Sequence, residues 1–150
     1  MNEKTASLVR LMNKIYRCTQ VYTDEALEKF QLSSGTYPYL MVLSRCEGIS
    51  QKQISKELNV DKAMSARVIK KLIELGYVEK QEDEKDCRAC KLFLTDKAKS
   101  IVPEIKNDIN KWIGFITEGF DEEENEFVAD YLEKVLFNAK RYRKNDKEEI

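Results

Sequence analysis

The sequence predicts a mostly α-helical protein with one small β-hairpin, an α+β fold formed as a single domain over residues 1–150. Apolar side chains recur every three or four residues along most of the chain, which is the period of an α-helix. That period gives way to short β-favourable segments only between Tyr77 and Leu94. A chain of 150 residues with 42% hydrophobic side chains is long enough and apolar enough to build one core.

The first helix is expected within residues 1–34, where neither Gly nor Pro interrupts the helical pattern. Its apolar stripe consists of Leu8, Leu11, Met12, Ile15, Thr19 and Tyr22. A second, shorter helix is expected over residues 37–43, and Gly48 marks its end.

Two short helices are predicted next, separated by a tight turn. Ser50 and Gln53 form a capping box, in which each side chain bonds the other residue's backbone N–H, so a helix starts there. Asn59 begins a turn and Asp61 is a good N-cap for the following helix, which Gly76 ends. The buried stripe of that helix is expected to be Ser65, Val68, Ile69, Leu72 and Leu75.

The pattern after Gly76 predicts a hairpin and then two long helices. Residues 77–81 and 90–94 are β-favourable, and the charged residues 82–86 between them are expected to form a solvated tip. Thr95 can cap the first long helix, and Asp121 precedes the second. Both helices, within residues 96–145, carry broad apolar faces.

This order of elements is that of a winged helix-turn-helix, which residues 36–95 would form. Its second short helix would enter the major groove of DNA, and its hairpin would reach the neighbouring backbone or minor groove. Side chains expected to face DNA are Lys52, Lys62, Ala63, Ala66, Arg67, Lys70 and Lys71. Arg67 suits guanine, the two alanines allow contact with thymine methyl groups, and the lysines suit phosphates.

Charge supports this interpretation locally although the formal net charge of the chain is -1. Residues 51–80 carry seven basic and four acidic side chains, and no acid lies between Lys62 and Leu72. An exposed charge acts over about 8–10 Å at ordinary salt, so a local cationic face can bind nucleic acid on a near-neutral protein. A solvated helix face in an ordinary bundle would normally mix both signs.

Four segments resemble the MarR family of transcription regulators: ISQKQIS at 49–55, VDK at 60–62, LIELGYVEK at 72–80 and DCRACKLFLT at 86–95. The last is similar to the family's wing signature, Asp-x-Arg followed by Leu-Thr. The resemblance implies a homodimer on a palindromic operator, with residues 1–34 and 96–145 as dimerisation helices. It implies that Arg88 enters the minor groove and that Asp86 either orients it or pairs with a nearby cation. Apolar stripes on the flanking helices, wider than one small domain can cover, independently favour a partner subunit.

The sequence departs from the family at Ala63, Met64 and Ala66, where Ser or Thr is common, and at Cys87, where a basic residue is common. These departures concern the operator sequence rather than the mode of binding.

The resemblance also implies a repressor that a small amphipathic or phenolic effector releases from DNA. Residues expected to line the effector site are Tyr16, Phe30, Tyr37, Tyr39 and Met41. Two alternatives stay open: a dimeric winged-helix module that binds protein, and a regulator that senses oxidants through a thiol such as Cys18.

Enzymatic and metal functions are poorly supported. The chain has no His, which removes the most common general base and zinc ligand. Cys87 and Cys90 have zinc-like spacing but supply two ligands where a structural zinc needs four, so neither a metal nor a cofactor is expected. Cys18 and Cys46 fall in helical patterns and are expected to be buried. A cytoplasmic location is expected, because no signal-peptide core or bilayer-length apolar segment is present.

Overall fold

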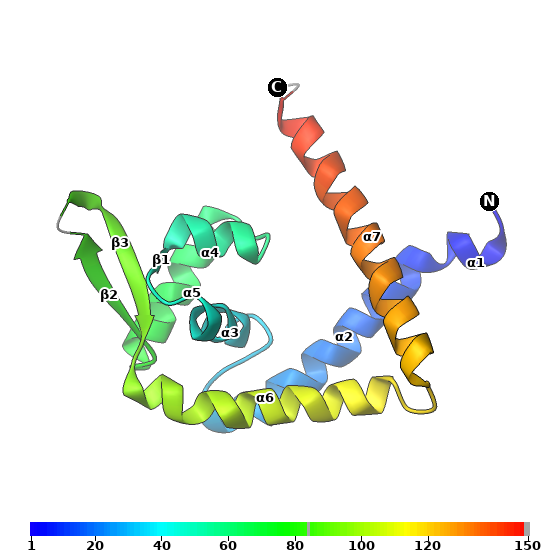
Figure 1. Ribbon diagram of the computed structural model, residues 1–150, viewed down its shortest axis with the longest axis horizontal. Helices are drawn as coiled ribbons and strands as arrows, with labels where there is room; N and C mark the ends of the chain where they lie inside the picture. The colour runs from blue at the N-terminus through cyan, green and yellow to red at the C-terminus, as the bar shows by residue number, and fades with distance from the viewer. Residues whose placement is uncertain (84, 149–150) are drawn as a thin grey trace. The chain divides into compact units, whose positions relative to one another are not determined.

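A computed structural model describes residues 1–83 and 85–148, with the side chains of 83, 86–89 and 144–148 left undescribed (Figure 1). It is mostly helical with one small antiparallel sheet, which confirms the predicted fold class. The chain divides into two compact units, Met1–Trp112 and Ile113–Ile150. Each is described by itself below.

The first unit begins with α1 (Glu3–Ala6), α2 (Leu8–Leu27) and the 3-10 helix η1 (Glu28–Phe30). The predicted long N-terminal helix is therefore confirmed, although Ser7 separates a short first turn from it. The helical segment ends at Gln31, which adopts a left-handed conformation with φ 57°. That conformation turns the chain toward the next helix, as left-handed residues do at helix ends.

Three helices follow: α3 (Tyr37–Arg45), α4 (Gln51–Glu57) and α5 (Lys62–Glu74). The capping box at Ser50 is present as predicted, with Ser50 N–H donating to Gln53 Oε1 and Gln53 N–H donating to Ser50 Oγ. Asp61 caps α5 by accepting the Met64 N–H at 2.7 Å. Both predicted helix starts are confirmed.

The sheet has three strands in the order β1-β3-β2, where β1 is Ile49–Ser50, β2 is Val78–Asp83 and β3 is Asp86–Leu94. The predicted hairpin is confirmed, but its strands extend beyond 77–81 and 90–94 into the charged stretch expected to be a loop. Backbone bonding holds these residues in the ladder whatever the polarity of their side chains. The strand β1 was not predicted, because two residues carry no periodicity.

Gly48 joins β1 to β3 through a close approach that only glycine allows. Its φ is +80°, and a Cβ atom there would lie 3.3 Å from the Phe93 ring. The Gly48 N–H donates to Leu92 O at 2.8 Å. A side chain at this position would meet both backbone strain and a crowded ring.

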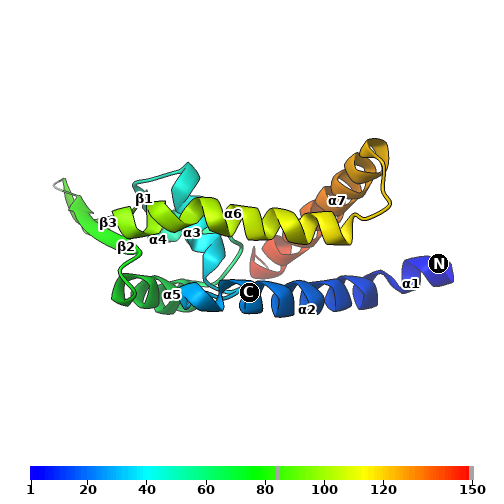
Figure 2. The ribbon, with the colours of Figure 1, turned by 90° about the horizontal axis from the view of Figure 1, so that it is seen from below.

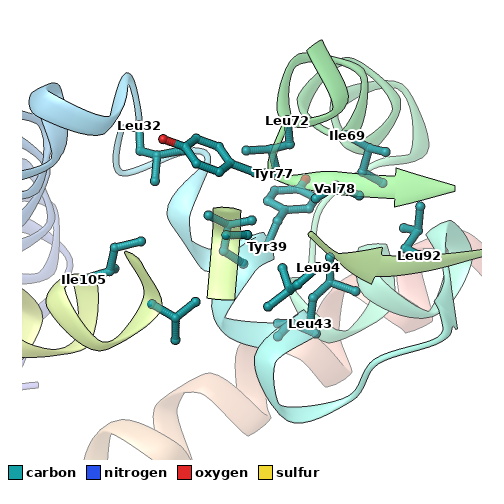
Figure 3. Close-up of a cluster of buried hydrophobic side chains, with 14 of the residues drawn as sticks. Leu32, Tyr39, Leu43, Ile69, Leu72, Tyr77, Val78, Leu92, Leu94 and Ile105 are labelled. Carbon is teal, nitrogen blue, oxygen red and sulfur yellow. The ribbon is translucent and has the colours of Figure 1, made fainter. Parts of the chain in front are cut away.

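The core lies where the helices of the first unit cover this sheet (Figure 3). Leu43 of α3, Ile69 and Leu72 of α5, and Leu92 and Leu94 of β3 are each at most 5% exposed. The predicted stripe of α5 is confirmed at Ser65, Ile69 and Leu72, which are buried, while Val68 and Leu75 are half-buried and pack against the core.

The helix α6 (Asp96–Ile116) begins at Thr95, whose Oγ1 accepts the Ala98 N–H and donates to Gly76 O. Within the first unit, α6 contacts α2 (Figure 2). The rings of Tyr22 and Trp112 stack with centroids 4.8 Å apart, and Trp112 Nε1 donates to Thr19 Oγ1 at 3.0 Å. The Thr19 to Tyr22 stripe predicted for α2 thus packs on α6.

The second unit contains α7 (Glu122–Glu148), which starts with a reciprocal pair of bonds between Asp121 and Glu124. No side chain described in this unit, residues 113–143, is buried. Its exposed apolar residues are Ile113, Phe115, Ile116, Phe120, Phe127, Val128, Tyr131, Leu132, Leu136, Phe137 and Tyr142. Exposed apolar surface of this extent is typical of an interaction site.

Two sequence predictions about cysteines are wrong. Cys18 and Cys46 were expected to be buried, but both are exposed free thiols. Cys46 is the C-cap of α3 and lies past the buried stripe of that helix. Cys18 precedes Thr19 on α2, about 100° around the helix from the side chain that packs on α6.

None of the described helices combines the length and apolar character needed to cross a bilayer.

Candidate nucleic-acid interface

The helices α4 and α5 form a helix-turn-helix whose turn is fixed by backbone bonds. Leu58 N–H donates to Ile54 O, and Val60 N–H donates to Ser55 O, each at 3.0 Å. Asn59 adopts the left-handed conformation, with φ 55°, that ends α4 and directs the chain into Asp61. The predicted turn at residues 59–61 is confirmed.

Three buried hydroxyl groups connect α3, α4 and α5. Ser65 Oγ lies 2.7 Å from Ser55 Oγ and 3.1 Å from Tyr39 Oη, and Ser55 Oγ is also 2.8 Å from Gln51 O. The three residues are at most 6% exposed. Bonds between buried polar groups depend strictly on position, so this cluster fixes α5 against its two neighbours. The helical period predicts that Ser65 lies in the buried stripe, but it does not reveal the hydroxyl groups that Ser65 contacts.

The outward face of α5 is formed by exposed side chains, and the six predicted DNA contacts on this helix are all among them. They are Lys62, Ala63, Ala66, Arg67, Lys70 and Lys71. Helical spacing puts Ala63, Arg67 and Lys70 near the middle of this face. Three further exposed residues of α5 were not predicted to contact DNA: Met64, Ile73 and Glu74. Met64 is 43% exposed. The sequence did not predict this exposure, because nothing in it marks an apolar residue near a helix start as facing solvent.

The cations of this face have no carboxylate partner in the described part of the chain. The five ion pairs found there involve no residue of α5. Examples are Lys99 with Glu47 at 3.3 Å and Arg45 with Glu57 at 4.0 Å. Lys52, on α4, is also exposed and outside these pairs. The charge on α4 and α5 therefore stays available to an external anion.

The hairpin β2–β3 lies beside α5, and β2 contacts that helix (Figure 1). Exposed side chains on it include Lys80, Gln81, Glu82, Lys85 and Lys91. The backbones of Asp86 and Arg88 belong to β3, whereas their side chains lie outside the described residues.

The residues predicted to line an effector site fall in different environments. Tyr39 is buried in the core, and Phe30, Tyr37 and Met41 are half-buried and pack against it. Burial raises the pKa of the Tyr37 hydroxyl above its ordinary value of 10.0. Tyr16, on α2, is 64% exposed and does not join this group.

No group of three metal-ligating side chains is present among the residues that the structure describes. Of the predicted thiol pair, Cys90 is half-buried and free, and the Cys87 side chain lies outside the described residues.

The comparison with known proteins identifies the family. The transcriptional regulator BilQ of Clostridioides difficile (strain CD3) is 32% identical over 134 residues, which cover 89% of this chain and 90% of BilQ. A sequence model described as the MarR family matches residues 30–89, which span the helix-turn-helix and most of the hairpin. The chain belongs to the MarR family of transcriptional regulators.

Solved structures agree with this MarR assignment. A MarR transcriptional regulator from Methanosarcina mazei Go1 is 34% identical with a TM-score of 0.83, covering 90% of this chain and 97% of that one. MepR of S. aureus, solved as a DNA complex, is 21% identical with a TM-score of 0.82, covering 87% of this chain and 97% of MepR. The MepR likeness shows that the two chains share a fold. The predicted winged helix-turn-helix is thereby confirmed as that of a MarR regulator.

Proposed function

We propose that this MarR-family chain is a homodimeric, sequence-specific reader of double-stranded DNA, and that it represses transcription until a small amphipathic or phenolic effector binds. The observation that carries the proposal is the outward face of α5. It is cationic, free of acid until Glu74, and held outward by buried contacts on its other side. Such a face suits the major groove, which is lined by acceptors and bordered by phosphates.

Each side chain of the interface has a proposed role. Arg67 pairs with guanine, and Lys62, Lys70 and Lys71 bind phosphates from the ends and flank of α5, with Lys52 adding a contact from α4. Ala63 and Ala66 let the helix backbone approach the bases. Arg88 enters the minor groove from the hairpin, and Asp86 orients it, as the resemblance to the family implies.

A second copy of the chain is the proposed cover for the apolar faces of the flanking helices. The exposed apolar residues of α2 are Leu8, Val9, Leu11, Ile15, Tyr16 and Val21, and α7 carries a longer set. Twofold pairing buries the same patch on both subunits, and it presents two α5 helices to a palindromic operator.

The effector is proposed to act through Phe30, Tyr37, Tyr39 and Met41, whereas the part expected of Tyr16, which lies exposed on α2 apart from this group, stays a prediction. Tyr39 lies in the hydrophobic core of the first unit, and Phe30, Tyr37 and Met41 pack against that core. This supports the assignment, because a ligand bound there would disturb the helices that support α5. Titrating candidate phenols into a protein–DNA complex tests it. The expected result is release of DNA at a phenol concentration that leaves the protein folded.

The decisive experiment measures DNA binding as a function of salt. For a duplex selected from a random pool, the logarithm of the binding constant should fall linearly with the logarithm of the salt concentration. The slope should be about -0.9 per phosphate neutralised. A protein-binding module of the same fold would select no duplex, and its protein interface would be far less sensitive to salt.

Arg88→Ala tests the hairpin in the same assay. The expected loss of affinity for the selected duplex is about 1–3 kcal/mol, with the dimer still folded. Lys106→Ala, which removes a cation on the exposed side of α6, is the matched control and should bind DNA normally. Unchanged binding of the Arg88 variant would remove the hairpin from the interface.

A further inference from the structure

The outward face of α5 contains no strong side-chain hydrogen-bond acceptor in its first three turns. Its exposed side chains there are Lys62, Ala63, Met64, Ala66, Arg67, Lys70 and Lys71. Each is either a donor or an apolar group, and the thioether of Met64 is only a weak acceptor. The one strong side-chain acceptor in this stretch, Ser65, is 0% exposed and lies against Ser55 and Tyr39. The hydroxyl of Ser65 is therefore withheld from any ligand on the outward side.

This chemistry limits which bases the helix can select. Adenine N6 and cytosine N4 offer donors in the major groove, and reading either one requires an acceptor such as Asn, Gln, Asp or Glu. A face without acceptors can select guanine through a donor and thymine through its C5-methyl group. Arg67 supplies the donor for guanine, which leaves the apolar residues to meet thymine.

Met64 is the largest exposed apolar side chain in these first three turns. It is 43% exposed, and it lies at the flank of this face, one helical turn before Arg67 and about 100° around the helix from Ala63. An unbranched thioether adapts its shape to the surface it meets, so Met64 can follow methyl groups along the groove. Ala63 and Ala66 lie three residues apart, on the same side of the helix, and keep the backbone close to the bases.

We propose that Met64, with Ala63 and Ala66, forms an apolar reading surface that selects thymine methyl groups, so that each half-site joins one guanine to adjacent thymines. The proposal rests on the proposed DNA-binding function and names the operator chemistry that α5 reads. Met64 is then a specificity-determining residue rather than a core residue.

The test replaces thymine by deoxyuridine, which lacks the C5-methyl group but keeps the base-pairing edge. A duplex is selected from a random pool, and the thymines of its half-sites are replaced one at a time. Each replacement that removes a contacted methyl should weaken binding about fourfold, the effect of exposing one buried methyl-sized group. Replacements outside the half-sites, in the same duplex, should have no effect.

Met64→Ala then separates the reading surface from the rest of the interface. This variant should bind the thymine duplex more weakly and should no longer distinguish it from the deoxyuridine duplex at the contacted positions. Lys106→Ala, on the exposed side of α6, is the control and should keep the distinction. Met64→Gln, which adds an acceptor, should shift selection from the pool toward adenine. Thermal unfolding of each variant checks that the fold is intact.

The outcomes are distinguishable. Tight binding of a selected duplex with no response to deoxyuridine in its half-sites overturns the reading surface and leaves the proposed function standing. A response that persists unchanged in Met64→Ala overturns the role of Met64. Failure to select any duplex overturns the proposed function, and the reading surface with it.

Discussion

The outward faces of α5 and of α7 differ in what they present to solvent. On α5, Lys62, Arg67 and Lys70 surround small or flexible apolar residues. On α7, large apolar residues such as Leu132 and Tyr131 are 52% and 63% exposed. Water solvates the first face well, and a duplex can replace that water without burying any unpaired charge on α5. The second face gains free energy only when an apolar surface covers it.

The two faces also differ in what lies behind them. The buried side of α5 packs on the core and makes side-chain hydrogen bonds, so the chain itself fixes its position. The described part of α7 has no buried side chain. The helix-turn-helix therefore has its buried side covered within one chain, whereas the apolar face of α7 is left uncovered by the described residues of its own unit.

The largest expected effect is at Leu132. Leu132→Asp places a carboxylate in the middle of the apolar stripe of α7, where burial against a partner would leave it unpaired. The exposed members of this stripe are Phe127, Val128, Tyr131, Leu132, Leu136 and Tyr142. The dimer should dissociate at least tenfold more readily, and operator binding should fall with it. Sedimentation over a range of protein concentrations measures the change.

Phe137→Asp is the matched control, because Phe137 is an exposed apolar residue on the opposite side of α7 from the stripe. It should sediment as the parent protein does. A Leu132→Asp protein that remains fully dimeric would show that the stripe of α7 is not an interface.

The next effect concerns the buried hydroxyl cluster. Ser65→Ala leaves the hydroxyls of Ser55 and Tyr39 without their shared partner, and should cost about 1–3 kcal/mol of unfolding free energy. Tyr39→Phe leaves the Ser55–Ser65 contact in place and should cost less. Equilibrium urea unfolding measures both. Ser100→Ala, on the exposed side of α6, should change stability by less than about 0.5 kcal/mol and provides the reference.

A smaller effect is expected for the phosphate contacts of α5. Lys70→Ala should weaken binding to all duplexes by a similar factor and should flatten the salt slope by about one unit per bound half-site. Salt titration on selected and unrelated duplexes measures this. A loss confined to one base position in the operator would contradict the phosphate assignment.

The smallest effect is the contribution of Tyr37 to stability at alkaline pH. Burial raises the pKa of the folded-state hydroxyl above 10.0, so the unfolded chain ionises first as pH rises. In that range the folded state keeps the hydroxyl proton that the unfolded state has lost. The contribution of Tyr37 to the free energy of unfolding is therefore complete below pH 10 and decreases as the pH rises above it. Tyr37→Phe should lose less stability between pH 8 and pH 10.5 in urea unfolding. An equal loss in both proteins would assign the alkaline decline to other groups.

Much of the helix-turn-helix was predictable from the sequence, because the residues that specify each helix end lie close together in the chain. The capping box at Ser50, the cap at Asp61 and the end of α5 at Gly76 each depend on residues within one turn of one another. The outward direction of Lys62 and Arg67 followed from the helical period alone.

The failures share a cause, which is contact between residues distant in the sequence. The two-residue strand β1 exists because it pairs with β3 about forty residues later. The exposure of Cys18 and Cys46 depends on where neighbouring helices pack, and the composition of their own helices does not reveal it.

By itself, the sequence determined the order of helices and strands, the sign of the charge on α5 and the resemblance to the MarR family. Short-range caps and a fixed helical period encode these directly. Only the tertiary structure decided that Ser65 turns its hydroxyl toward Ser55 and Tyr39, and that Met64 faces outward beside Arg67. Those features arise from packing between helices, where one position is buried and its neighbour exposed according to which surfaces meet.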